Sequence, residues 1–180
     1  MYALTDYDYY HPEDLIAQEP VNQRDQSRLL HLKKSTGKIA HHQFSSLTNL
    51  LKKGDVLVVN NTKVIPARMF GRKETGGKFE ILIVNYASAA QNNHSGEKIE
   101  FECLVKASKS PKPGTRIDFG PDLKAAVSTV NKRTCTLEFF CEKPFDDVLN
   151  TLGVMPLPPY IKRDQAKDPK DKDKTSYQTI

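Results

Sequence analysis

The feature that most constrains the fold is a series of short segments in which apolar and polar residues alternate. Over residues 99–105, the odd positions hold Ile, Phe, Cys and Val, and two of the three even positions hold Glu. Successive side chains of a strand point to opposite faces, so this pattern predicts a strand with one buried face. The alternation returns around Ile117 and over residues 135–141, and a turn-like segment at 109–114 separates two of these stretches. Several short strands at this spacing predict a small β-barrel or sandwich over about residues 64–141.

The first third of the chain has a mixed character. Strands are predicted over residues 29–34 and 39–44, and a helix is predicted to begin at Ser45 or Ser46, which can cap it. The run Val56–Val59 is continuously apolar, as in strands that are buried on both faces of a parallel sheet. This part of the chain therefore predicts an α/β frame.

The last part of the chain changes character again. An apolar stripe at helical spacing predicts a helix over residues 145–152 that ends at Gly153. The prolines within residues 155–160 exclude a helix interior or a central strand there. Residues 163–174 mix charges of both signs and are expected to form a solvated linker, and residues 177–180 are expected to begin a new element.

Composition and charge exclude several classes of protein. The chain has 180 residues and a formal net charge of +5, a mild excess that suits an anionic partner. No apolar run reaches the roughly 18 residues that a membrane helix needs, and the N-terminal residues show no secretory signal pattern. The three cysteines are an odd number without zinc-site spacing. A cytoplasmic location, no membrane association and no metal site are therefore expected.

The segment 24–28 concentrates charged and polar groups just before a predicted strand. Arg24 and Arg28 can hold a phosphate or a carboxylate through paired N–H donors, with the Ser27 hydroxyl beside them. The competing interpretation is a structural ion pair in which Asp25 caps a turn.

Two further segments carry candidate binding groups. Asn60 and Thr62 follow the predicted buried strand, where an amide and a hydroxyl can bind a ribose or a carboxylate; ordinary turn chemistry explains them equally well. The backbone N–H groups at Gly76 and Gly77 can meet a ligand, although a hairpin turn is the commoner use of such a pair.

The proline-rich segment ends in an aromatic residue and cations. Tyr160 can stack on a base and Arg163 can hold a phosphate, or the segment is only a rigid connector. No phosphate-binding glycine loop, nucleophile elbow or zinc spacing is present in the sequence. The residues alone therefore indicate a mildly basic cytosolic protein with a β-barrel inserted in an α/β frame.

Several segments, taken together and in order, indicate a protein family, although the chemistry of each segment alone does not. They are residues 15–18, 24–30, 54–68, 71–80, 155–163 and 177–179. Together they resemble the S-adenosylmethionine:tRNA ribosyltransferase-isomerase family of queuosine biosynthesis, over essentially the whole chain. The long block 54–68 and the Pro-Leu-Pro-Pro-Tyr-Ile-Lys-Arg block are the most specific.

The resemblance implies an incomplete α/β domain with an inserted small antiparallel β-barrel. The α/β domain is expected to begin in residues 1–62, the barrel to occupy residues 63–152, and residues 153–180 to return into a truncated α/β domain. Family members continue well past the Tyr-Gln-Thr motif at residues 177–179. The chain therefore resembles an N-terminal half, either a truncated gene product or one piece of a split enzyme.

The resemblance also implies a reaction. The family transfers and isomerises the ribosyl group of S-adenosylmethionine onto 7-aminomethyl-7-deazaguanine in the wobble position of tRNA, which gives epoxyqueuosine and releases adenine and methionine. S-adenosylmethionine is then a co-substrate, and no tightly bound cofactor is expected. A base must remove the acidic proton beside the sulfonium, and Asp25 or Glu80 is the candidate. The expected substrate-binding set consists of Arg24, Ser27, Arg28, Asn60, Thr62, Arg68, Gly76, Gly77, Tyr160 and Arg163.

The sequence also departs from the family pattern. Asn61 stands where the family has an aspartate, Lys63 where it has an arginine, and His11 where an apolar residue is usual. The largest departure is length, because family members continue well past residue 180, and a second chain that supplies the missing half is therefore considered as a partner, besides tRNA. Two other interpretations stay open: a non-catalytic tRNA-binding module, and a decayed gene product whose unpaired strand at Val56–Val59 promotes aggregation.

Overall fold

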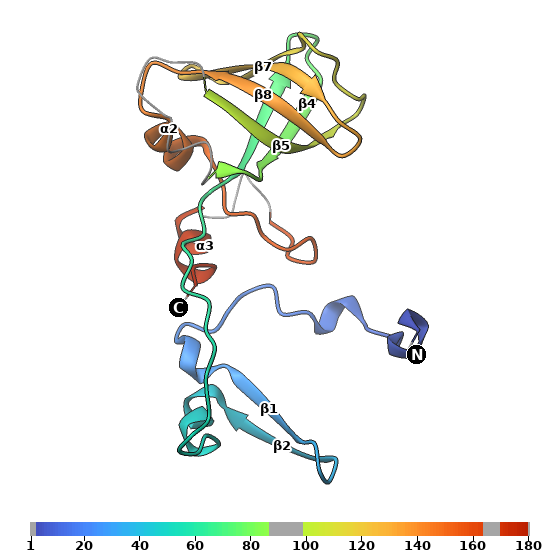
Figure 1. The fold of residues 1–180 in the computed structure, drawn as a ribbon, viewed down its shortest axis with the longest axis vertical. Coiled ribbons are helices and arrows are strands. Elements are labelled where there is room, and N and C mark those ends of the chain that lie inside the picture. Colours follow the sequence, from blue (N-terminus) through green and yellow to red (C-terminus); the bar gives the residue numbers. More distant parts are fainter. Residues whose placement is uncertain (1–2, 87–98, 164–169, 180) are drawn as a thin grey trace. The chain divides into compact units, whose positions relative to one another are not determined.

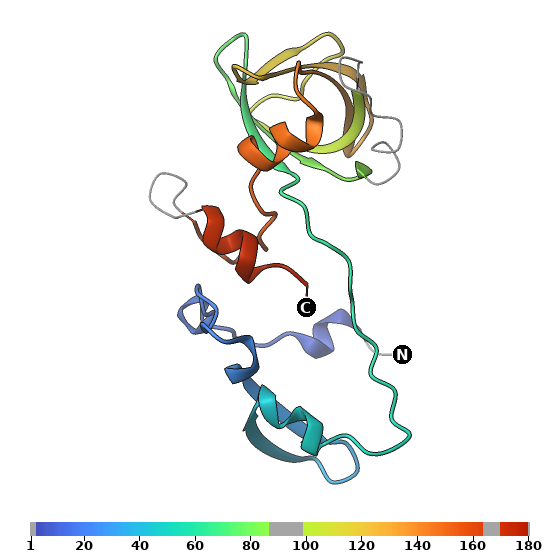
Figure 2. The ribbon, with the colours of Figure 1, turned by 90° about the vertical axis from the view of Figure 1, so that its left-hand side faces the viewer.

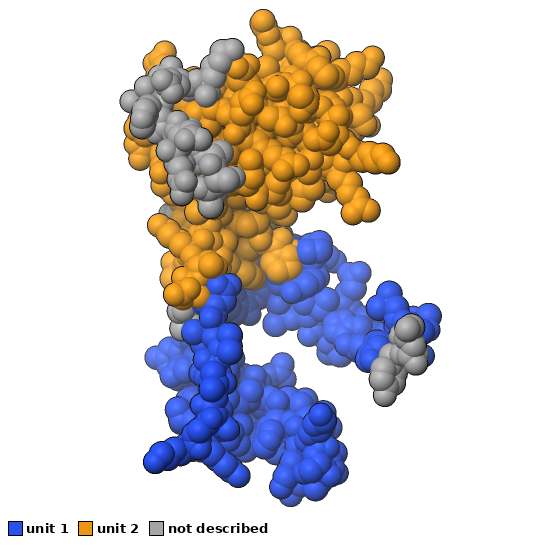
Figure 3. Space-filling model, viewed as in Figure 1, with its two compact units in different colours: residues 1–60, 159–162 blue, residues 61–158, 163–180 orange. Residues whose placement is uncertain are grey.

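The computed structural model forms two compact units, coloured separately in Figure 3. Unit 1 comprises Met1–Asn60 and Pro159–Lys162, and unit 2 comprises Asn61–Pro158 and Arg163–Ile180. Every side chain that is buried in the described part of the chain belongs to unit 2. The residues that the structure describes are 3–86, 99–163 and 170–179.

Six antiparallel strands of unit 2 close into a barrel, whose ring is visible in Figure 2. The strand order is β3-β4-β5-β8-β7-β6, and pairing between β3 and β6 completes the ring. Figure 1 labels β4, β5, β7 and β8 of this barrel. The small barrel predicted from the alternating pattern is therefore confirmed. Its strands are β3 (Arg68–Lys73), β4 (Lys78–Ile83), β5 (Ile99–Ala107), β6 (Arg116–Gly120), β7 (Leu123–Val130) and β8 (Thr134–Phe140).

Closure of the barrel depends on a close approach between β3 and β6. Arg72 pairs with Asp118, and Lys73 pairs with Ile117. A Cβ atom at the neighbouring Gly71 would lie 2.8 Å from the backbone oxygen of Asp118 and 2.9 Å from the Ile117 side chain. Real side chains do not approach so closely, so a glycine at this position lets the two strands meet.

The inward-facing side chains of the barrel form the hydrophobic core. The shared face expected on residues 135–139 is confirmed, because Cys135, Leu137 and Phe139 are all buried. Cys141, which follows the end of β8, is only half-buried. The alternation of apolar and polar residues in this segment thus matches the buried and the outward faces of β8.

An aromatic cluster joins the barrel to the helix that follows it. Phe101, Phe139 and Phe145 are mutual neighbours, with ring centroids 4.9–5.8 Å apart. Phe145 begins α2 (Phe145–Leu152), and the buried face of this helix also holds Val148 and Leu149. The predicted helix and its end before Gly153 are confirmed. The helix therefore extends the core of the barrel.

The end of the chain returns to the barrel. Val154 forms an antiparallel bridge with Arg68, and its N–H donates to the Arg68 oxygen at 2.8 Å. The Gln178 side chain binds the backbone of Val64 in both directions: its amide donates to the Val64 oxygen at 2.7 Å and accepts from the Val64 N–H at 3.0 Å. The segments that enter and leave unit 2 are therefore tied together.

The solvated linker expected over residues 163–174 is wrong for its described C-terminal part. Lys170–Ser176 form the helix α3, and residues 164–169 lie outside the described residues. Within unit 2, Asp173 of this helix forms an ion pair with Arg163 at 3.1 Å, and both side chains are 14% exposed. A turn and a bend follow at residues 177–178, and the new element that the sequence predicts to begin there stays a prediction. The ion pair between Arg163 and Asp173 holds this part of the chain in place. The mixed charges of the segment gave no indication of which residues would pair.

Unit 1 is built from a hairpin and short turns. Strands β1 (Arg28–Lys33) and β2 (Lys38–Gln43) pair antiparallel, close to the predicted positions. The helix expected after Ser45 or Ser46 is a 3₁₀ helix instead. Residues 3–60 hold neither an α-helix nor a parallel strand pair, so the α/β frame expected here is not observed. The 3₁₀ segments are η1 (Leu4–Tyr7), η2 (Glu13–Leu15), η3 (Arg24–Gln26) and η4 (Phe44–Asn49).

The prediction of a buried strand at Val56–Val59 is wrong for this structure. The segment has no strand pairing, and its four side chains are 58–88% exposed. A strand that is buried on both faces needs neighbouring strands and covering helices, and none of the described residues supplies them. The apolar run therefore marks a surface that needs a cover.

A pair of leucine substitutions tests this contrast between the units. Leu137 is fully buried, so Leu137→Ala should lower the free energy of unfolding by about 2–5 kcal/mol. Leu30 of β1 is 58% exposed, so Leu30→Ala should change it by only about 0.5 kcal/mol. Urea unfolding followed by circular dichroism measures both values. Equal losses would contradict a packed barrel in unit 2 and an exposed hairpin in unit 1.

The cysteines allow a second test. Burial raises the pKa of the Cys103 thiol strongly, with the nearby Cys135 adding to the shift, and burial also raises the pKa of Cys135 and Cys141. A raised pKa lowers the fraction of reactive thiolate at neutral pH. Iodoacetamide should therefore label Cys141 first and Cys103 last, with faster labelling as the pH rises. Peptide mass spectrometry gives the order, and rapid labelling of Cys103 in the folded chain would contradict the buried position.

Candidate functional site

The β3–β4 hairpin brings two of the predicted site residues together. Arg68 lies on β3, and Glu80 lies on β4 opposite Phe70. The Arg68 Nε atom lies 3.5 Å from the Glu80 Oε1 atom, and both side chains are close to 30% exposed. The guanidinium and the carboxylate therefore form one half-exposed charged pair, which can bind a polar substrate group.

The turn between these strands uses its glycines structurally. Gly76 has a φ of 82°, a left-handed conformation that favours glycine. Its N–H donates to the Lys73 oxygen at 2.8 Å, and the Gly77 oxygen accepts from the Lys73 N–H at 2.9 Å. Arg72 Nη1 also donates to the Gly76 oxygen at 3.3 Å. The Gly76 N–H is therefore engaged inside the turn.

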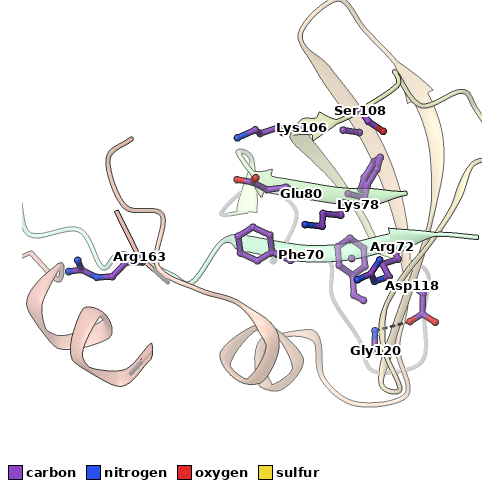
Figure 4. A pocket seen from close by; sticks show the side chains of 13 residues that line it. Phe70, Arg72, Lys78, Glu80, Lys106, Ser108, Asp118, Gly120 and Arg163 are labelled. Atoms are coloured by element: carbon purple, nitrogen blue, oxygen red, sulfur yellow. Dashed lines mark hydrogen bonds between the residues drawn. The ribbon is translucent and has the colours of Figure 1, made fainter. Parts of the chain in front are cut away.

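An open groove lies on the outer face of the barrel beside the Arg68–Glu80 pair. Figure 4 shows Phe70, Lys78, Glu80 and Lys106 on the neighbouring strands that line it. The sequence analysis missed Phe70, Lys78 and Lys106. The signal that marks them is their outward position in strands whose alternate residues, such as Met69 and Phe79, are buried.

A second charged pair lies at the far side of this groove. Asp118 of β6 accepts a hydrogen bond from the Lys124 ammonium at 2.5 Å and from the Gly120 N–H at 2.8 Å. These two hydrogen bonds lower the pKa of the Asp118 carboxyl, with Lys124 contributing most. The carboxylate form is therefore favoured, and its charge is matched by a neighbouring cation.

Arg163 and Thr62 both have partners within unit 2. Two nitrogens of the Arg163 guanidinium donate to the two oxygens of Asp173, each at 3.1 Å. The backbone oxygen of Thr62 accepts a hydrogen bond from the Thr179 hydroxyl. Arg163 is thus held by a carboxylate of its own chain, and Tyr160, its expected companion, belongs to unit 1.

The cluster at residues 24–28 adopts a compact turn in unit 1. The Ser27 hydroxyl donates to the Arg24 oxygen at 2.7 Å, and the Ser27 oxygen accepts from the Phe44 N–H at 2.8 Å. Asp25 lies exposed in the first turn of η3, and Arg28 begins β1. Arg24, Asp25 and Arg28 are all exposed at this turn. Asn60, at the other end of the unit, lies exposed in an extended segment.

A glutamine that the sequence analysis missed fixes the proline-rich segment within unit 1. The Gln18 side chain donates to the Tyr160 oxygen at 3.0 Å and accepts from the Lys162 N–H at 2.7 Å. The Lys162 ammonium also binds Glu13 at 2.9 Å. The Tyr160 ring is 53% exposed and is available for stacking. The two hydrogen bonds of the Gln18 amide to this segment could not be predicted, because they leave no periodic pattern in the sequence.

The described residues contain no group of three or more His, Cys, Asp or Glu side chains placed to hold a metal ion. Neither of the two α-helices in the described part of the chain has the length and apolar character that crossing a membrane requires.

The family profile described as "Queuosine biosynthesis protein" matches residues 4–180 of the chain. The chain belongs to this family. The matched range includes both the Arg68–Glu80 pair and the cluster at residues 24–28.

Curated relatives agree with this assignment. A protein from Carboxydothermus hydrogenoformans is 44% identical over 178 residues, which are 98% of this chain and 48% of the relative. A protein from Syntrophotalea carbinolica is 40% identical over 178 residues, which are 98% of this chain and 49% of the relative. Both are named S-adenosylmethionine:tRNA ribosyltransferase-isomerase. The chain therefore spans about half the length of the curated relatives it matches.

One solved structure is also similar. The crystal structure of an S-adenosylmethionine tRNA ribosyltransferase from Thermotoga maritima is 35% identical. The match covers 83% of this chain and 48% of that protein, with a TM-score of 0.38.

The contact between Glu13 and Lys162 gives a prediction for the pH dependence of unit 1. The hydrogen bond from Lys162, and then its charge, lower the pKa of Glu13, while Glu13 raises the pKa of Lys162. A lowered carboxyl pKa means that the contact persists above the usual range of glutamate and is lost as the pH falls through the lowered value. An NMR titration should show Glu13 titrating at lower pH than in a Lys162→Met variant. Identical titration curves would contradict the contact.

Proposed function

We propose that this chain takes part in the transfer and isomerisation of the ribosyl group of S-adenosylmethionine to 7-aminomethyl-7-deazaguanine in tRNA, which gives epoxyqueuosine. The observation that carries the proposal is the family match over residues 4–180, together with relatives that are named for this transfer. S-adenosylmethionine is a co-substrate in this proposal, because its ribose is consumed, and no tightly bound cofactor is needed.

The proposed chemistry requires a base and several anion-binding groups. A base must remove the acidic proton beside the sulfonium, and a positioned carboxylate is suited to this step. Glu80 is the candidate in unit 2, where Arg68 holds its carboxylate in place at 3.5 Å. Asp25 is the candidate in unit 1. Arg24 and Arg28 would bind the methionyl carboxylate or phosphates of the tRNA.

We also propose a second polypeptide as a partner. It corresponds to the half of the relatives that this chain does not match. The support comes from unit 1, where the side chains of Val56–Val59 are 58–88% exposed and no described residue from 3 to 60 is buried. Strands and helices of the second polypeptide would cover this apolar run. The complete site would then form only in the assembly.

A second candidate function is a non-catalytic tRNA-binding module. The barrel favours it, because unit 2 has a complete hydrophobic core of its own and an open groove lined by cations. In this case the chain would bind tRNA with a strong dependence on salt concentration and would release no adenine. A decayed gene product, the third interpretation, would expose Val56–Val59 permanently and would aggregate.

Adenine release from S-adenosylmethionine tests the proposed reaction. The chain is assayed with tRNA that carries 7-aminomethyl-7-deazaguanine, alone and with a polypeptide covering the unmatched half of the Carboxydothermus relative. We expect release only from the mixture. Glu80→Gln should lower the rate by about 10²–10⁴-fold if Glu80 is the base, whereas Glu100→Gln, an exposed glutamate of β5, should leave it unchanged. Asp25→Asn tests the other candidate in the same way, with the exposed Asp8→Asn as its control.

The outcomes separate the interpretations. Tight binding of tRNA without release in any mixture would favour the binding module. Release by the chain alone would contradict the need for a second polypeptide. If both Glu80→Gln and Asp25→Asn retain full turnover, neither carboxylate is the base.

A further inference from the structure

The outer face of the barrel carries a patch that the proposed reaction does not use. We define the outer-face patch as Phe70 and Arg72 of β3, Lys78 of β4 and Lys106 of β5. Arg72 is the register partner of Lys78. Glu80 pairs with Phe70 on one side and with Lys106 on the other. Because neighbouring strands lie about 4.8 Å apart, the patch spans roughly 10 Å across three strands.

The electrostatic balance of this patch is positive. Two carboxylates border it, and each is matched by a cation outside the patch: Glu80 by Arg68 at 3.5 Å, and Asp118 by Lys124 at 2.5 Å. Lys78 and Lys106 are exposed, and neither forms an ion pair with another described residue. The patch therefore presents cationic charge that the rest of unit 2 does not neutralise.

Phe70 is the unusual member of the patch. Its side chain is 37% exposed, although it belongs to a strand whose neighbouring residue Met69 is only 1% exposed. Figure 4 shows the Phe70 ring at the surface of β3, beside Glu80 and Lys78 on the next strand. The Phe70 ring does not belong to the buried core of the barrel, and a partly exposed aromatic ring can stack on a flat partner.

We propose that the outer-face patch binds an unpaired RNA strand, with the three cations on its phosphates and Phe70 stacked on one base. Charge complementarity selects a polyanion, and the exposed ring selects one whose flat bases are accessible. In duplex RNA the faces of the bases are already stacked, so the patch fits a single-stranded loop better than a stem. The choice of RNA as the polyanion rests on the proposed function, in which tRNA is the substrate.

Salt-dependent binding tests the role of the cations. A fluorescent RNA hairpin of the size of an anticodon stem-loop is titrated with the full chain at several salt concentrations, and anisotropy gives the dissociation constants. Loss of two phosphate contacts to a single strand should reduce the slope of log K against log salt by about 1.4. We therefore expect this reduction for the double variant Lys78→Gln/Lys106→Gln. The matched control Lys132→Gln/Arg133→Gln removes the same charge from the exposed β7–β8 turn and should retain the slope.

The role of the ring is tested by a matched pair of aromatic substitutions. Phe70→Leu keeps an apolar side chain but removes the stacking surface, and should weaken binding to the hairpin by about 5-fold or more. Phe140→Leu changes a phenylalanine of β8 that is 41% exposed, and should have no effect. A blunt RNA duplex without a loop should bind more weakly than the hairpin and should not distinguish Phe70→Leu from the unchanged chain.

The results separate this inference from the proposed reaction. Equal slopes for the two double variants, or equal binding of duplex and hairpin, would overturn the outer-face patch as a single-strand site even if adenine release is observed. Loss of slope and of affinity in the patch variants alone would support it, even if no mixture releases adenine. Thermal unfolding of each variant shows that the barrel is intact.

Discussion

The meeting of β3 and β6 is the constraint on which unit 2 depends. Two register pairs close the barrel there, and Gly71 makes the approach possible because a Cβ atom would lie within 2.8 Å of the β6 backbone. Closure makes one face of β3 part of the inner wall of the barrel, and the pleat of the strand directs alternate side chains to that face. Met69 points into the core, while Phe70 and Arg72 point outward and line the groove. The packing of the interior and the chemistry of the surface thus follow from one contact between strands.

The two units differ in whether their apolar side chains are buried. In unit 2 the alternating strands direct Phe101, Leu137 and Phe139 into one core, and α2 adds Phe145 to it. Unit 1 has the same kinds of residues, but its described part forms only one hairpin and short 3₁₀ segments, and Leu30, Leu32 and Val56–Val59 remain exposed. Burial of apolar surface is the main favourable contribution to folding. The barrel buries its apolar side chains within its own fold, whereas the apolar side chains of unit 1 stay exposed.

Much of the barrel could be predicted from the sequence because alternation is a local property. Residues 99–105 and 135–139 show their two faces directly, and the helix at 145–152 shows its stripe. The run Val56–Val59 was misjudged for a different reason: four apolar residues show that burial is favourable, but they carry no information about the strands that would bury them. The prediction of a linker over residues 163–174 was wrong for its last part. The Arg163–Asp173 ion pair forms between residues ten positions apart, and the local sequence does not show that they meet.

In the candidate site, too, some residues could be predicted from the local sequence and others could not. The Arg68–Glu80 pair follows from the register of one hairpin and lies within reach of sequence reasoning once the turn at Gly76 is recognised. Phe70 and Lys106 could not be singled out, because outward residues of a strand look alike whether they bind a ligand or only water. Gln18 and Gln178 lie in two of the segments that carry the family resemblance, but their roles were not predicted, since no local pattern shows that a side-chain amide binds a distant backbone.

The bond between Gln178 and Val64 has an evolutionary consequence. It holds together two points of unit 2 that are 114 residues apart in the chain, at the places where the polypeptide enters and leaves the barrel region. A domain whose ends meet can be inserted into a host protein, or exchanged for another, without stretching the host backbone. The barrel can therefore diverge in length and in surface chemistry among relatives while the junction that carries it stays the same.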